Sequence, residues 1–210
     1  MNGPVRLDAA PLRADLALIA DMVEPEARVL DIGCGKGELL GFLAREKRVD
    51  GRGMELDQGE INACVARGLS VVQGDADADL ADYPDAAFDY AVLSQTLQAT
   101  RRPERVLLEL VRIGRRAVVS FPNFGFWRVR WALLSRGRMP VTPGLPEPWH
   151  QTPNIHLCTI RDFVELCRAH RIAIERGAAL SSGGVVRPLS QDLRLANLLG
   201  EHAVFLLRKA

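Results

Sequence analysis

The sequence predicts an open α/β fold in which helices cover both faces of a doubly wound, mostly parallel sheet of seven strands. Five apolar runs between residues 29 and 121 are separated by segments long enough to form helices. Strands that alternate with helices in this way form parallel sheets with right-handed crossovers. Two more apolar runs, at 172–180 and 202–207, bring the expected number of strands to seven.

The expected elements follow one another in a regular order. Strands are expected at residues 29–31, 53–55, 69–73, 88–94, 116–121, 172–180 and 202–207. Helices are expected at residues 11–23, 38–47, 58–67, 103–113 and 160–169. The first helix is amphipathic, and we expect it to cover an edge of the sheet. Asp57 is expected to cap the third helix, and Thr159 with Asp162 to form a capping box before the fifth.

Length and composition indicate a single folded domain over residues 1–210. Hydrophobic residues make up 48% and charged residues 25%, which are globular averages and argue against disorder. A formal net charge of +1 predicts no nucleic-acid partner. The four cysteines and four histidines lack metal-ligand spacing, so we expect reduced thiols and no metal. No apolar run is long enough to cross a bilayer, and we expect a cytoplasmic protein without a membrane partner.

A glycine-rich turn follows the first expected strand. Asp31 ends the apolar run, Gly33, Gly35 and Gly37 alternate with other residues, and a helix starts near Glu38. Glycines let the backbone approach a ligand closely, and the helix start offers unpaired N–H groups. A dinucleotide-binding loop would have its third glycine one residue later. The spacing resembles the first motif of S-adenosylmethionine (SAM)-dependent methyltransferases, whose sulfonium cofactor does not conflict with nearby acids.

Further candidate cofactor ligands end the next strands. Glu55 stands about 20 residues after the glycines, where a carboxylate accepts hydrogen bonds from ribose hydroxyls. Asp75 follows the third strand, where an acid contacts the adenine amino group in SAM-binding proteins; the alternative is that it caps a helix. Ser94 ends the fourth strand and faces the same crevice. The predicted cofactor site comprises Asp31, Gly33, Gly35, Gly37, Glu55, Asp75 and Ser94.

Residues for catalysis are weakly indicated. Methyl transfer to nitrogen or oxygen needs groups that orient the acceptor and often a base. Gln95 follows the fourth strand and Asn123 the fifth, and both can donate hydrogen bonds but cannot act as a base. His156 is the only histidine expected near the crevice, and its alternative role is a structural hydrogen bond. The sequence therefore leaves open whether the protein is an enzyme.

The segment 122–158 is an insertion rich in aromatic residues, arginine and proline, and is longer than a strand-to-helix connection requires. It contains all three tryptophans. Trp127 and Trp131 stand one helical turn apart, with Arg128 and Arg130 beside them. One interpretation is a lid whose tryptophans pack into the core. The other is a partner-binding surface formed by these four residues, since Trp and Arg dominate interface hot spots.

Four segments together resemble the MetW family of methionine biosynthesis proteins. They are residues 29–38, 94–103, 120–130 and 152–159, and the likeness extends over nearly the whole chain. The resemblance implies a class I SAM-dependent methyltransferase (Rossmann-like) fold. It also implies a role beside homoserine O-acyltransferase, the enzyme that activates homoserine for methionine synthesis.

Two functions follow from this resemblance and from the residues. The first is an accessory or regulatory subunit that docks on homoserine O-acyltransferase and binds SAM or S-adenosylhomocysteine, which would make it a sensor of the downstream product. The second is a SAM-dependent methyltransferase on an unidentified small-molecule or protein acceptor, positioned by Gln95, Asn123 or His156. We favour the first, because the segments most specific to the family are surface-like rather than catalytic.

Overall fold

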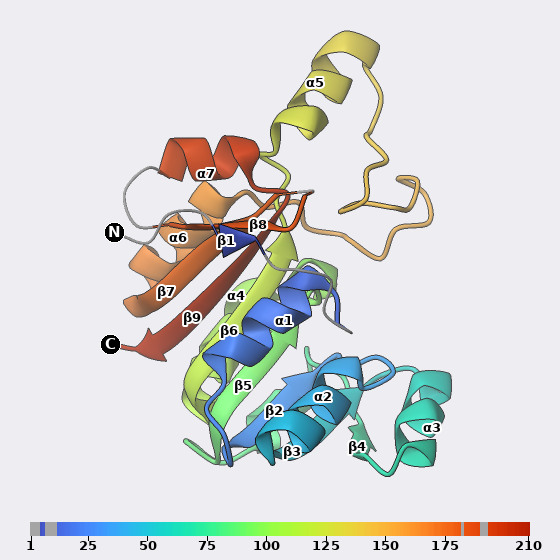
Figure 1. The fold of residues 1–210 in the computed structure, drawn as a ribbon, viewed down its shortest axis with the longest axis vertical. Helices are drawn as coiled ribbons and strands as arrows, with labels where there is room; N and C mark the ends of the chain where they lie inside the picture. Colours follow the sequence, from blue (N-terminus) through green and yellow to red (C-terminus); the bar gives the residue numbers. More distant parts are fainter. Residues whose placement is uncertain (1–4, 7–11, 182, 190–192) are drawn as a thin grey trace.

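The computed structural model describes residues 5–6, 12–181, 183–189 and 193–210, and its strands form one sheet (Figure 1). The strands are β1 (Val5–Arg6), β2 (Arg28–Ile32), β3 (Asp50–Glu55), β4 (Ser70–Gln73), β5 (Phe88–Ser94), β6 (Gly114–Pro122), β7 (Ile172–Leu180), β8 (Val185–Pro188) and β9 (His202–Lys209). The helices are α1 (Ala14–Met22), α2 (Glu38–Lys47), α3 (Gln58–Ala66), α4 (Pro103–Ile113), α5 (Trp127–Arg136), α6 (Ile160–Ala169) and α7 (Leu193–Leu199), with short 3-10 turns η1 (Asp79–Asp82) and η2 (Leu97–Ala99). No helix within these described ranges is long and apolar enough to cross a membrane.

The sheet combines a parallel half and an antiparallel half. In the described part of the chain its nine strands have the order β1-β8-β7-β9-β6-β5-β2-β3-β4. Neighbours from β6 to β4 are parallel, and neighbours from β1 to β6 are antiparallel. The predicted α/β class is confirmed, but the predicted number of seven strands is wrong. β1 and β8 have two and four residues, which is too short for a periodic pattern to reveal them.

The central strands are buried on both faces and so build two hydrophobic cores. Successive strand residues point to opposite faces. Val118 of β6 therefore packs into the core under α1 and α2, whereas its neighbour Val119 packs into the core under α4 and α6. Figure 1 shows α1 in front of the sheet and α4 behind it. Burial on both faces explains why these strands are continuous apolar runs in the sequence.

Local sequence signals predict the helix ends well but not the position of the first helix. Asp57 caps α3 by accepting a hydrogen bond from Glu60 N at 2.9 Å. Thr159 and Asp162 form the expected capping box at α6. The expectation that the first helix covers a sheet edge is wrong, because α1 packs on β6 and β9, which lie inside the sheet.

The insertion leaves the body of the protein between β6 and α6. Its helix α5 stands away from the sheet (Figure 1). The chain that follows, residues 137–159, returns to the body without regular helices, and we call it the arm. The arm meets the body at Gly144, whose N–H donates to Glu201 Oε1 at 2.9 Å.

Candidate functional site

The glycine-rich turn between β2 and α2 has the conformation that its sequence predicts. Gly33, Gly35 and Gly37 have φ angles of 68°, 52° and 69°. Residues other than glycine rarely adopt such positive φ angles. A Cβ added at Gly33 would lie 2.5 Å from Thr96 Oγ1, whereas a Cβ added at Gly35 would meet nothing within 4 Å. The turn is therefore packed against the protein at Gly33, whereas no described residue lies next to the position of a Cβ at Gly35.

Glu55 holds this turn from the end of β3. Its Oε2 accepts a hydrogen bond from Gly35 N at 2.8 Å, and its Oε1 accepts from Leu56 N at 2.8 Å and Asp57 N at 3.1 Å. A carboxylate has about four acceptor positions, so one is left for a donor such as a ribose hydroxyl. A phosphate placed at Gly35 would meet a like charge. The turn therefore suits a ligand without a pyrophosphate.

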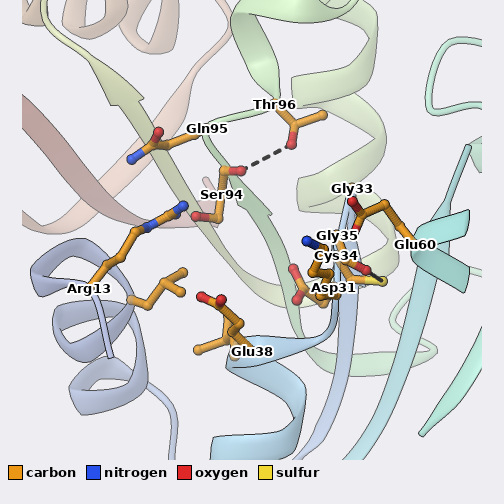
Figure 2. Close-up of a pocket in the computed structure, with 13 residues that line it drawn as sticks. Arg13, Asp31, Gly33, Cys34, Gly35, Glu38, Glu60, Ser94, Gln95 and Thr96 are labelled. Carbon is orange, nitrogen blue, oxygen red and sulfur yellow. Dashed lines mark hydrogen bonds between the residues drawn. The ribbon is translucent and has the colours of Figure 1, made fainter. Parts of the chain in front are cut away.

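A cavity of about 440 Å³ opens in front of the turn, and we call it the turn cavity. Its walls come from the glycine turn, the start of α2, the end of β5 and the residue before α1 (Figure 2). This volume lies in the range of small-molecule sites, about 300–1,000 Å³. Glu55 does not belong to its lining, because its carboxylate turns toward the loop backbone. Whether Glu55 contacts a ribose stays a prediction.

The turn cavity offers negative charge that lacks partners. Asp31 is 2% exposed, and its Oδ1 has no hydrogen-bond partner among the described residues. Burial, and then the nearby Glu55 carboxylate, raises the pKa of Asp31 to about 7. Glu60 Oε2 is buried without a partner as well. Since buried carboxylates need compensation, these two groups fit a ligand that carries positive charge.

The remaining predicted cofactor ligands differ in position. Ser94 lines the turn cavity, and its Oγ lies 3.2 Å from Ser120 Oγ. Asp75 does not line it; its Oδ1 accepts a hydrogen bond from Asp77 N at 2.9 Å in the turn before η1. The N-cap of η1 is Ala78 and has no side-chain cap, so Asp75 closes a local turn and does not cap a helix, and its contact with adenine stays a prediction.

Two of the three residues considered for catalysis lie outside the turn cavity. Asn123 is 1% exposed, and its amide donates to Asn197 O and Gly200 O, both at 2.8 Å. His156 is exposed, and its backbone N–H donates to Gln98 O at 2.9 Å. The geometry of Asn123 favours a structural role. The third candidate, Gln95, lines the cavity, and its Nε2 donates a hydrogen bond to Asp15 Oδ2 at 2.7 Å.

Four charged residues of the turn cavity are absent from the predicted cofactor site: Lys36 and Glu38 belong to the turn and the helix start after it, whereas Arg13 and Glu60 come from elsewhere in the chain. Arg13 lies across the cavity from the glycine turn (Figure 2) and pairs with Asp15 at 3.1 Å. Glu60 lies in the first turn of α3. Tertiary packing alone brings Arg13 and Glu60 to the cavity, and no motif in the sequence marks them.

The helix α5 is a second candidate site, and we call Trp127, Arg128, Arg130 and Trp131 the α5 surface. Trp127 is 44% exposed and Trp131 is 61% exposed. The interpretation that these tryptophans pack into the core is therefore wrong. The Arg128 guanidinium lies 5.5 Å from the centre of the Trp127 ring, and Arg130 donates to Gly125 O at 2.6 Å.

The fold places the protein in the structural class of class I SAM-dependent methyltransferases. The structure of a SAM-dependent methyltransferase from Mesorhizobium loti matches with a TM-score of 0.68 and 18% identity, covering 93% of this chain and 98% of that chain. The [4+2]-cyclase SpnF matches with a TM-score of 0.65 and 20% identity, covering 92% of this chain and 80% of that chain. These likenesses show the fold alone, and the cyclase illustrates that this fold does not fix the reaction.

The chain belongs to the MetW family. The family model for methionine biosynthesis protein MetW matches residues 13–207. The bifunctional methionine biosynthesis protein MetXA/MetW of Rhodopirellula baltica is 34% identical over 173 residues, which are 78% of this chain and 28% of that protein. The chain therefore spans less than a third of that relative's length, and the family to which it belongs is described as one of methionine biosynthesis proteins.

Proposed function

We propose that this protein is an accessory subunit of homoserine O-acyltransferase, that it docks on that enzyme through the α5 surface, and that it binds SAM or S-adenosylhomocysteine in the turn cavity. The exposure of α5 carries the proposal. Of its ten residues, Val129 is the only one that is buried. Helices in proteins owe most of their stability to a packed apolar face, so a partner that covers α5 would complete it.

The relative from Rhodopirellula baltica supports the choice of partner. Its name joins MetXA to MetW in one bifunctional protein, and the acyltransferase is the partner that the resemblance to the MetW family implies. A single chain holds its two parts at a high effective concentration. Two separate chains need an interface with its own affinity, and Trp and Arg are enriched among the few residues that dominate the binding energy of such interfaces.

The charge of the insertion indicates what its partner presents. Residues 122–158 contain four arginines and one glutamate. The insertion also presents apolar surface, because Trp131 and Leu134 on α5 are 61% and 81% exposed. The complementary surface on the acyltransferase is therefore an apolar groove with acidic residues at its rim.

The residues of the turn cavity fit a cationic cofactor. Asp31 and Glu60 carry the unpartnered carboxylate oxygens that would face its positive charges. Arg13 would take its carboxylate, and Glu55 has one acceptor position left for ribose. When bound, SAM supplies an electrophilic methyl group. If the cofactor regulates docking, linkage requires that the partner change the affinity for SAM by the same factor.

The docking proposal is tested with purified proteins. The chain and the acyltransferase of the same organism are mixed, and the mass of the complex is measured by light scattering over a concentration series. Trp131→Ala should weaken association about 30-fold or more, as expected for a hot-spot residue worth about 2 kcal/mol. Val65→Ala, at a 58% exposed position of α3, is the matched control and should leave association unchanged. Equal binding by the Trp131 variant and the natural protein would refute the docking site.

Methyl transfer is the second candidate function, and the position of Gln95 at the turn cavity favours it. An acceptor could receive a hydrogen bond from this amide, although the cavity offers no histidine as a base. The test is transfer of labelled methyl groups from SAM to a cell extract. Label that appears with the natural protein and disappears with Glu55→Ala would support this function, and the absence of any labelled product would count against it.

A further inference from the structure

A second cavity of about 480 Å³ adjoins the turn cavity, and we call it the arm cavity. The two cavities share Arg13 and Gln95 in their linings. The opposite wall of the arm cavity is the returning arm of the insertion, through Pro143, Gly144 and Pro146. The arm cavity therefore lies between the glycine-turn region and the insertion, and the proposed function leaves it without a role.

Negative charge predominates in the arm cavity. Asp15 and Glu201 are each 5% exposed. Arg13 pairs with Asp15 at 3.1 Å, which balances one carboxylate. Glu201 accepts the Gly144 N–H but forms no ion pair with any described residue. Burial lowers the pKa of His202, which keeps that imidazole neutral at neutral pH. One carboxylate charge is thus left uncompensated.

Gln95 is held in a strained conformation at the junction of the two cavities. Its φ angle is 52°, and its N–H donates to Ser120 O at 2.9 Å. Its side chain donates to Asp15 Oδ2 at 2.7 Å. Non-glycine residues rarely adopt the left-handed region, and those that do cluster at binding sites.

The arm approaches the body so closely that only glycine fits at position 144. A Cβ there would lie 2.9 Å from Glu201 Cγ and 3.0 Å from His202 Nε2. The backbone of the arm therefore rests directly on the two polar residues of the cavity floor. This contact closes the cavity on the side of the insertion.

We propose that the arm cavity binds a small molecule through a protonated amine, with Glu201 as its counter-ion and Gln95 and His202 as polar neighbours. A cation facing Glu201 compensates a buried carboxylate that has no ionic partner in the described part of the chain. An anion of the same size would be repelled by that carboxylate, and a neutral molecule would leave it uncompensated. Because the arm forms a wall, the amine also contacts the insertion that carries α5.

Three probes with the same carbon chain test the proposal. They are 3-aminopropan-1-ol, propane-1,3-diol and 3-hydroxypropanoate, which are cationic, neutral and anionic. Their dissociation constants are measured by protein NMR titration, with the side-chain resonances of His202 as the local reporter. The amine should bind at least about tenfold more tightly than either other probe and should shift the His202 resonances. Equal or tighter binding of the anion or the diol would overturn the proposal without any variant.

Variants locate the amine. Glu201→Gln keeps an acceptor oxygen for Gly144 N and should weaken amine binding about tenfold or more. Glu147→Gln, an exposed position on the arm, should leave it unchanged. If Glu38→Gln weakens binding instead, the amine occupies the turn cavity and the proposal fails. Should the Glu201 variant not fold, the ranking of the three probes and the His202 shifts still decide the question.

Discussion

The glycine turn and α5 are stabilised in opposite ways. Gly33 in the turn and Gly137, the C-cap of α5, have positive φ angles of 68° and 61°. At Gly33 a side chain would collide with Thr96, whereas at Gly137 it would meet nothing within 4 Å. The turn is fixed by the fold around it, whereas Val129 is the one residue of α5 that is buried. The comparison teaches that the fold of the protein itself preorganises the turn, whereas α5 is left exposed, as the proposed docking of a partner requires.

The largest effect is expected at the root of the insertion. Asn123→Ala removes hydrogen bonds from Asn197 O, Gly200 O and Gly125 N, all buried. We expect the free energy of unfolding to fall by about 3–5 kcal/mol, because these groups are left without partners. Urea denaturation followed by circular dichroism measures it. Gln151→Ala, an exposed amide on the arm, is the control, and a similar loss in both variants would contradict the anchoring role of Asn123.

The next largest effect compares the cost of adding a side chain at Gly33 with the cost at Gly137. Gly33→Ala adds backbone strain and a close contact with Thr96, and should lower the free energy of unfolding by about 2–4 kcal/mol. Gly137→Ala adds strain alone, and should lower it by about 1 kcal/mol. The same urea experiment measures both variants. Equal losses would mean that the turn is no more tightly packed than the end of α5.

The buried carboxylate of Asp31 should make the free energy of unfolding depend on pH. The pKa of Asp31 is raised from 3.8 to about 7, so the folded state binds more protons than the unfolded state between these values. The free energy of unfolding contributed by Asp31 therefore decreases as pH rises through this window. Asp31→Asn should remove this decrease and should be more stable than the natural protein by about 1–3 kcal/mol at about pH 8.

Urea denaturation between about pH 5 and about pH 8 measures this difference between the two proteins. The variant should also bind SAM more weakly, because it lacks the charge that would face the cofactor. If the free energy of unfolding depends on pH in the same way in both proteins, the pKa of Asp31 is not raised in the folded state.

The smallest effect on stability is expected on α5. Trp131 is 61% exposed, so Trp131→Ala should change the free energy of unfolding by less than about 0.5 kcal/mol. Thermal unfolding of the isolated chain checks this value. A loss of about 2 kcal/mol or more would show that the ring packs into its own protein.

The sequence predicts those parts of the structure that depend on neighbouring residues. The glycine turn, the Asp57 cap and the Thr159–Asp162 capping box are of this kind, since each is a local pattern with a fixed geometry. Residues that meet only through the tertiary fold were missed. Arg13 reaches the turn cavity from the start of α1, and no spacing in the sequence connects it with the glycines.

The insertion marks the other limit of sequence reasoning. An apolar stripe on a helix looks the same whether it packs into its own core or onto another protein. The exposure of Trp127 and Trp131 contradicts packing into the core, and it depends on where the fold directs the chain after β6. Binding of another protein stays a prediction. Likewise, no pattern in the sequence predicts the hydrogen bonds that Asn123 donates to Asn197 O and Gly200 O.

The most direct test of the central claim is the acyl-transfer rate of the same organism's homoserine O-acyltransferase, measured with and without an equal concentration of this protein. The account predicts a large increase with the natural protein and little or none with Trp131→Ala. An unchanged rate, with no complex detected by mass, would contradict the accessory-subunit function and would make the search for a methyl acceptor the next task.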